Sequence, residues 1–245
     1  MNSGAYINDQ IPAVPVNTRA KSRTIALAAG ILYLLTFVSI PIAFLYTAVR
    51  DPNFIVGPGP DNPVIIGGIL EIIVALAGIG TAVALYPVVK RQNEAFALGF
   101  IGARTLEAAT IFAGVVSLMT MVTLRQSGPG EEALLIGRAL LASYDWFHLG
   151  QALMPAINAV LLGSLLYRAR LVPRILPLLG FIAVPFLIAH VIVLMFGISG
   201  PLLTLTTLGV LPIAVWEFSL GVWLVVKGFN PSPITAEYDK THSGR

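Results

Sequence analysis

The chain has 245 residues, of which 56% are hydrophobic and only 11% are charged, against about 25% charged in an ordinary soluble domain. Its mean hydropathy of +0.85 is typical of membrane proteins and leaves room for one helical bundle without a sizeable soluble domain. The absence of cysteine excludes disulfides, thiolate metal sites and a cysteine nucleophile. The formal charge of +3 comes mainly from bases between apolar stretches, so we expect contacts with lipid headgroups and not with nucleic acid.

The polar N-terminus, residues 1–24, contains Pro12 and Pro15 and is predicted to be a disordered cytoplasmic tail. The first apolar stretch is Ile25–Ala48, about 24 residues long, against 7–15 for the core of a secretory signal peptide. We therefore predict that this stretch is a membrane helix of the mature protein and not a signal peptide that is cleaved off. Because this stretch carries no charged side chain, we expect it at the periphery of the bundle.

Five further apolar stretches follow along the chain. A bilayer core about 30 Å thick needs about 20 residues at a rise of 1.5 Å each, so each stretch is long enough to cross. They are Val64–Val89, Phe96–Val122, Trp146–Tyr167, Ile175–Phe196 and Leu203–Val226. The predicted fold is all-α, an integral membrane six-helix transmembrane bundle over residues 25–228, followed by a flexible cytoplasmic tail at residues 229–245.

The joints between the stretches differ in character. The first, Arg50 to Pro63, holds four prolines and cannot be helical. In the third, Glu131–Ala142 is suited to a helix that either lies on the membrane surface or extends the fourth span outward. The fifth, Gly197 to Pro201, is short enough that the last two spans should be antiparallel neighbours.

The basic residues of the joints predict the orientation of the bundle. Eleven lie on one side of the membrane: Arg19, Lys21, Arg23, Lys90, Arg91, Arg168, Arg170, Arg174, Lys227, Lys240 and Arg245. Only three lie on the other: Arg50, Arg125 and Arg138. By the positive-inside rule the protein is expected in the plasma (inner) membrane with both termini cytoplasmic, an N-in/C-in topology.

Three charged residues are predicted at mid-to-inner depth in the bundle. Arg104 and Glu217 lie about nine and ten residues from the cytoplasmic ends of the third and sixth spans, which makes them level. Arg104 and Glu107 share a helix face. We expect a structural ion pair. Since these three charges sum to −1, the alternative is that Glu107 binds and releases a proton.

A second layer is predicted in the outer third of the bundle. It contains Glu71, His148 and His190 on three different spans, with Gln151 one turn below His148. These residue types are ligands of zinc and non-haem iron, and Asp145 could orient His148 from the second shell of such a site. The sequence shows no HExxH motif, so a polar pocket without a metal is the other interpretation. A divalent metal is the cofactor that these residue types suggest, and the sequence establishes none.

The layout resembles an uncharacterised family of prokaryotic membrane proteins, domain of unknown function 4386. The similar segments are RTIALAAGILYLLTFVSIP, the block GGILEIIVALAGIGTAVALYPVVKRQNEAFALGFIGARTLEA through the second and third spans, and HLGQAL in the fourth. Glu71 and the Arg104-x-x-Glu107 pair are its most specific features. The resemblance covers residues 23–228. It implies six spans and identifies no catalytic residue.

Three functions remain as hypotheses. The first is a polar intramembrane pocket, open to the outside, with a transport, sensing or accessory role for a small molecule or lipid. The second is a membrane-embedded enzyme with a metal held by Glu71, His148 and His190. The third is a proton-coupled carrier. Membrane lipids are the expected partners, together with either a second copy of the chain or another membrane protein.

Overall fold

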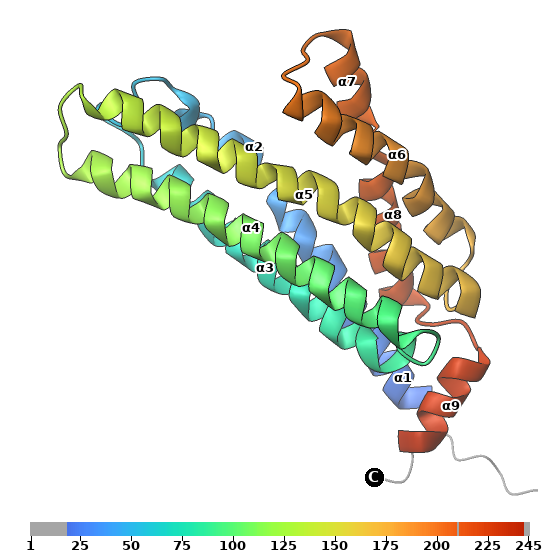
Figure 1. Ribbon diagram of the computed structural model, residues 1–245. Coiled ribbons are helices and arrows are strands. Elements are labelled where there is room, and N and C mark those ends of the chain that lie inside the picture. The colour runs from blue at the N-terminus through green and yellow to red at the C-terminus, as the bar shows by residue number, and fades with distance from the viewer. Residues whose placement is uncertain (1–18, 210, 243–245) are drawn as a thin grey trace, which may run out of the picture.

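The computed structural model describes residues 19–209 and 211–242, so most of the N-terminal tail predicted to be disordered lies outside the described residues. Within that part of the chain the regular structure is entirely helical (Figure 1). The helices are α1 (Arg19–Leu35), η2 (Thr36–Ser39), α2 (Ile42–Leu45), η3 (Ala48–Arg50), α3 (Asn62–Val89), α4 (Glu94–Gln126), α5 (Ala133–Ala169), α6 (Ile175–Met195), α7 (Pro201–Leu208), α8 (Leu211–Val226) and α9 (Pro233–His242).

Six helical segments of the described residues are long and apolar enough to cross a membrane, as predicted. The first crossing is Lys21–Leu45, in which the 3₁₀ turn η2 and Pro41 interrupt the regular helix. The last crossing combines α7 and α8. The fourth, α5, begins at Ala133, well before the predicted start at Trp146, so residues 133–142 extend this span at its N-terminal end and do not form a separate helix.

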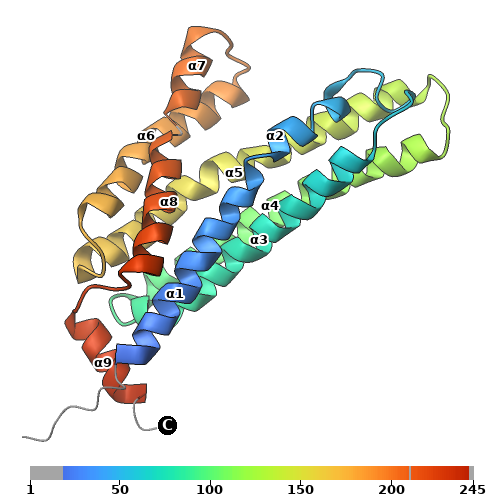
Figure 2. The same cartoon turned by 180° about the vertical axis from the view of Figure 1, so that it is seen from behind.

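The six crossings form a closed ring of helices. Helices α3, α4 and α5 pack in chain order as a long bundle, and α6 packs on both α5 and α8. Helix α1 closes the ring because it packs on α3 and on α8 (Figure 2). The short connection between α6 and α7 makes them neighbours, as predicted, and this hairpin diverges from the N-terminal end of α5 (Figure 1).

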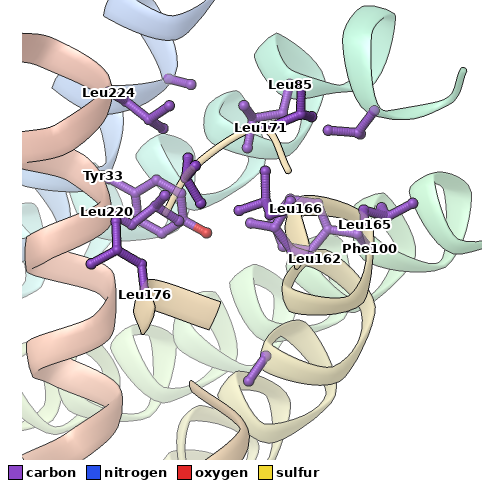
Figure 3. Packing of buried hydrophobic residues seen from close by; sticks show 14 of the residues in the cluster. Tyr33, Leu85, Phe100, Leu162, Leu165, Leu166, Leu171, Leu176, Leu220 and Leu224 are labelled. Carbon is purple, nitrogen blue, oxygen red and sulfur yellow. The ribbon is translucent and has the colours of Figure 1, made fainter. Parts of the chain in front are cut away.

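The larger hydrophobic core lies in the half of the ring that contains the start of α1 and the end of α8, and it draws on all six crossings. Figure 3 shows Tyr33 of α1 among leucines of α8 and α6, and Phe100 of α4 beside leucines of α5. Ala26, Ala29 and Tyr33 are 0% exposed. The first span, predicted at the periphery, is part of the ring and packs through small and aromatic side chains, while 28% of its most apolar stretch is buried, against 44% in α3, α4 and α5.

Helices α1 and α8 approach each other at a pair of glycines. A Cβ atom on Gly30 would lie 2.8 Å from the carbonyl oxygen of Gly221. That distance is shorter than any ordinary carbon–oxygen contact, so only glycine allows the backbones to come this close. Small residues commonly permit such contacts in membranes, where dispersion forces between backbones replace the hydrophobic effect.

The chain beyond Phe229 is not the loose tail predicted from its prolines. It forms α9, which lies beside the start of α1 (Figure 2). The carboxylate of Asp239 accepts hydrogen bonds from the backbone N–H and the hydroxyl of Ser22, at 3.1 and 2.9 Å. Arg91 pairs with Glu237 of α9 at 2.6 Å. Tyr238 of α9 also packs in the larger hydrophobic core, where it is 8% exposed, so polar and apolar contacts together hold this helix.

Candidate functional site

The structure brings the three residues of the predicted inner layer together. Nη1 of Arg104 donates to Oε2 of Glu107 at 3.0 Å, and Nη2 donates to Oε1 of Glu217 at 2.6 Å. Arg104 is 4% exposed. We call Arg104, Glu107 and Glu217 the ion cluster. One guanidinium faces two carboxylates, so the ion cluster carries a net charge of −1 when all three groups are ionised.

Neutral groups complete the surroundings of the ion cluster. The hydroxyl of Tyr33 accepts from Nη2 of Arg104 at 3.4 Å, and the amide of Asn158 donates to Oε2 of Glu107 at 2.9 Å. The guanidinium also lies 5.4 Å from the centre of the Tyr33 ring and 5.7 Å from that of Phe100. Cation–π contacts of this kind strengthen when the site is desolvated.

A cavity of about 500 Å³ lies inside the helix ring, against the ion cluster. Its size falls within the range of about 300–1,000 Å³ common for small-molecule sites. All six crossings contribute to its wall. The polar lining residues are Thr36, Ser39, Arg104, Glu107, His148, Gln151, His190, Thr207 and Glu217. The remaining wall is apolar and includes Phe37, Ile111, Leu187, Leu211 and Ile213.

The cavity joins the two layers that the sequence placed at different depths. His148, Gln151 and His190 line the same cavity as the ion cluster. The imidazole Nδ1 of His190 lies 3.4 Å from the hydroxyl of Thr206, which anchors the ring to α7. The cavity therefore has a charged end and an end lined by neutral polar groups.

Glu71 does not reach this cavity, contrary to the prediction. Its carboxylate is 3% exposed and accepts a hydrogen bond on each oxygen: from the hydroxyl of Tyr46 at 3.2 Å and from that of Tyr144 at 2.8 Å. We call Glu71, Tyr46 and Tyr144 the tyrosine clasp. The clasp joins α3 to the chain after α2 and to α5.

The predicted metal site is consequently not formed. Both carboxylate oxygens of Glu71 face tyrosine hydroxyls, while His148 and His190 line the cavity. Among the residues that the structure describes, no group of three or more His, Asp or Glu side chains is arranged to hold a metal ion. The position of Glu71 along its helix predicted it at the depth of the histidines. Its side chain, however, lies on the face of α3 that is turned toward Tyr46 and Tyr144.

Sequence reasoning missed both tyrosines of the clasp because their side chains carry no charge. A local signal is present at Gly67, one turn before Glu71. A Cβ atom on Gly67 would lie 2.2 Å from a ring carbon of Tyr46, so the glycine makes room for that ring. The ring of Tyr144 also lies 5.4 Å from the ring of His148, which places the clasp next to the cavity wall.

Asp145 pairs with Arg50 and does not act as a second-shell partner of His148. Nη2 of Arg50 lies 2.9 Å from Oδ1 of Asp145, and this hydrogen bond raises the pKa of Arg50 above its usual value. Arg125 pairs with Asp61 and also donates to the carbonyl of Gly57 at 3.0 Å. These pairs hold the first joint against the last turn of α4 and against α5.

Comparison with known proteins identifies the family of the chain but assigns it no activity. No curated protein and no solved structure matches the chain. The family model described as Domain of unknown function (DUF4386) matches residues 28–228. This range runs from α1 to the end of α8 and contains the ion cluster, the tyrosine clasp and every residue of the cavity wall. The resemblance seen in the sequence is thus confirmed, and the chain belongs to the family of domain of unknown function 4386.

Proposed function

We propose that the protein binds a small amphiphilic molecule in the cavity inside the helix ring, as part of a transport, sensing or accessory role. The observation that carries the proposal is the joining of a charged end and a largely apolar wall in one cavity of about 500 Å³. A membrane core seldom tolerates charged side chains unless they face a partner or a polar cavity. In this structure Arg104, Glu107 and Glu217 face one another and also line the cavity.

The charge of the ion cluster favours a cationic or hydrogen-bond-donating group on the ligand. The side chains of Glu107 and Glu217 are 13% and 16% exposed, and both line the cavity. In a low-dielectric interior, an excess negative charge attracts a cation strongly. The apolar wall near Phe37, Leu187 and Ile213 would then contact a hydrocarbon portion of the same molecule.

A second candidate function is a proton-coupled carrier. It is favoured by the imbalance of the ion cluster, in which Glu107 and Glu217 share the single guanidinium of Arg104. One proton arriving from the cavity would neutralise the excess charge, and a cationic ligand would do the same. Competition between the two would couple ligand flux to a proton gradient.

Filling the cavity is expected to abolish ligand binding while the fold survives. Ala152 lines the cavity and is partly exposed, so Ala152→Trp should occupy part of its volume. Native mass spectrometry of the protein purified in mild detergent, followed by release of bound molecules, should detect a ligand on the wild type and little on this variant. The matched control is Ala109→Trp, since Ala109 is exposed on α4 and does not line the cavity.

Two results would contradict these functions separately. Equal ligand occupancy in the wild type and in Ala152→Trp would argue against the cavity as the binding site. For the carrier, flux into liposomes should depend on an imposed pH gradient in the wild type and lose that dependence in Glu107→Gln. Flux that ignores both the gradient and the substitution would end the proton-coupled proposal.

We also propose the N-in/C-in orientation in the plasma membrane. The start of α1, the joints after α3 and α5, and α9 lie at the same end of the bundle, and this end carries most of the bases (Figure 1). Reporter fusions after Lys90, Arg170 and Lys227 should report the cytoplasm, and those after Pro60 and Gly130 the outside. If the fusion after Lys227 reported the outside, either the proposed orientation or the proposed number of crossings would be wrong.

A further inference from the structure

A second cavity, of about 650 Å³, lies at the end of the bundle where α1 begins and α8 ends. It is separate from the cavity of the proposed function, and the two share no lining residue. Its wall combines the start of α1, the residues that follow α8 and the first turns of α9 (Figure 2). The lining residues that matter here are Arg23, Lys227, Ser232, Thr235, Asp239 and Lys240.

The charge of this cavity is positive. Three cationic side chains and one carboxylate line it, for a net charge of +2. The carboxylate, Asp239, is 8% exposed and accepts two hydrogen bonds from Ser22. Those bonds direct both oxygens of Asp239 toward α1.

Arg23 is fixed in the cavity wall without losing its charge. Its Nη1 donates to the carbonyl of Leu224 at 2.9 Å, and its Nη2 donates to the carbonyl of Val225 at 2.5 Å. These carbonyls belong to the last turn of α8 and carry no net charge, so the guanidinium remains available to an anion. The backbone of Gly228, with φ of 76°, passes so close that an added Cβ would lie 3.1 Å from Cδ of Arg23.

The position of the cavity matches the depth of lipid headgroups. Lys227 is the first residue after α8, and α8 is the last part of the sixth crossing. Arg23 lies in the first turns of the first crossing. Side chains at the ends of spans lie level with the phosphates of the bilayer, and basic pockets of this kind bind anionic headgroups.

The start of α9 also lies at this cavity. Ser232 and Thr235 line the wall, but their hydroxyls are hydrogen-bonded within the first turn of α9: Oγ1 of Thr235 donates to the carbonyl of Ser232 at 2.9 Å, and Oγ of Ser232 accepts from the N–H of Thr235 at 3.2 Å. The ten-residue α9 also begins there, so the positive end of its dipole faces the cavity. From the cavity, its charge and its depth, we infer that this is a binding site for a phosphate-bearing anion, supplied by an acidic lipid headgroup or by free phosphate.

The test compares binding of short-chain phosphatidylglycerol with binding of inorganic phosphate to the full chain in detergent. The variant is Lys227→Gln, because Lys227 is exposed and no packing depends on it. The matched control is Arg168→Gln, an exposed base at the same end of the bundle and outside the cavity. We expect Lys227→Gln to weaken phosphatidylglycerol binding about fivefold, and Arg168→Gln to leave it unchanged. Adding Arg23→Gln should weaken it further.

The two arms identify the source of the phosphate. Thermal stabilisation by phosphatidylglycerol that inorganic phosphate cannot displace assigns the site to a lipid headgroup. Stabilisation by millimolar phosphate alone, lost in Lys227→Gln, assigns it to a soluble phosphate. Equal losses in Lys227→Gln and Arg168→Gln, or no binding of either probe, would overturn the inference. Neither result bears on the ligand of the inner cavity, because Lys227 is absent from its wall.

Discussion

Arg104→Ala is expected to lower the free energy of unfolding by about 3–5 kcal/mol, because it leaves two partly buried carboxylates inside the helix ring without their shared cation. Glu107 would keep only the amide of Asn158, and Glu217 would lose the partner that lies 2.6 Å from it. Reversible unfolding of the protein in mixed micelles, with increasing denaturing detergent, measures this loss directly. Arg168→Ala, which removes an exposed arginine, is the control and should change stability by less than about 0.5 kcal/mol.

Removing all three charges together separates the ion cluster from simple loss of a side chain. Arg104→Met with Glu107→Gln and Glu217→Gln leaves no buried charge, and replacing a whole buried ion cluster is often neutral or stabilising. We therefore expect this triple variant to be more stable than Arg104→Ala alone. If it were as unstable as the sum of its single substitutions, the three residues would not act as one cluster.

Glu71→Leu is expected to lower the free energy of unfolding by about 2–6 kcal/mol. The hydroxyls of Tyr46 and Tyr144 would each lose their acceptor inside the bundle, and an unsatisfied buried polar group costs about 1–3 kcal/mol. Glu71→Gln should cost far less, because its amide oxygen accepts from one hydroxyl and its NH₂ donates to the other. The same unfolding measurement distinguishes the two variants.

The two tyrosines supply the check on the clasp. In the variant with Tyr46→Phe, Tyr144→Phe and Glu71→Leu, no polar group remains to be satisfied, so most of the stability lost in Glu71→Leu should return. Equal stability of Glu71→Leu and Glu71→Gln would show that the two tyrosine hydroxyls find other acceptors. The tyrosine clasp would then contribute little to the free energy of unfolding.

The sequence predicted the crossings well because the thickness of the bilayer sets their length. An apolar run of about 20 residues has few alternatives to a membrane helix. The ends were less predictable. Helix α5 begins as early as Ala133 because Glu131–Ala142 suits a helix as well as any span does, and polar contacts to Ser22 and Arg91 help to hold α9 against the start of α1. Hydropathy carries no information about such contacts.

The sites were predicted in part, because a residue's position along a span gives its depth and not the direction of its side chain. Depth was sufficient for Arg104 and Glu217, which occupy facing helices. It was misleading for Glu71, which is level with the histidines but turned toward the tyrosines. Tyr33 could not be foreseen as a partner of Arg104, because uncharged aromatic residues are common on every face of a membrane helix.

The contact between α1 and α8 has a consequence for biosynthesis. The two helices stand at opposite ends of the family domain, yet they meet at Gly30 and Gly221 to complete the ring. As the chain leaves the ribosome, α1 is inserted first and cannot make its contact with α8 until the sixth crossing is inserted. Before that insertion, Arg104 can pair with Glu107 but not with Glu217, and the wall of the inner cavity lacks the residues that α8 contributes. Until the sixth crossing is inserted, the ring therefore stays open between α1 and α6, and Arg104 lacks its partner Glu217.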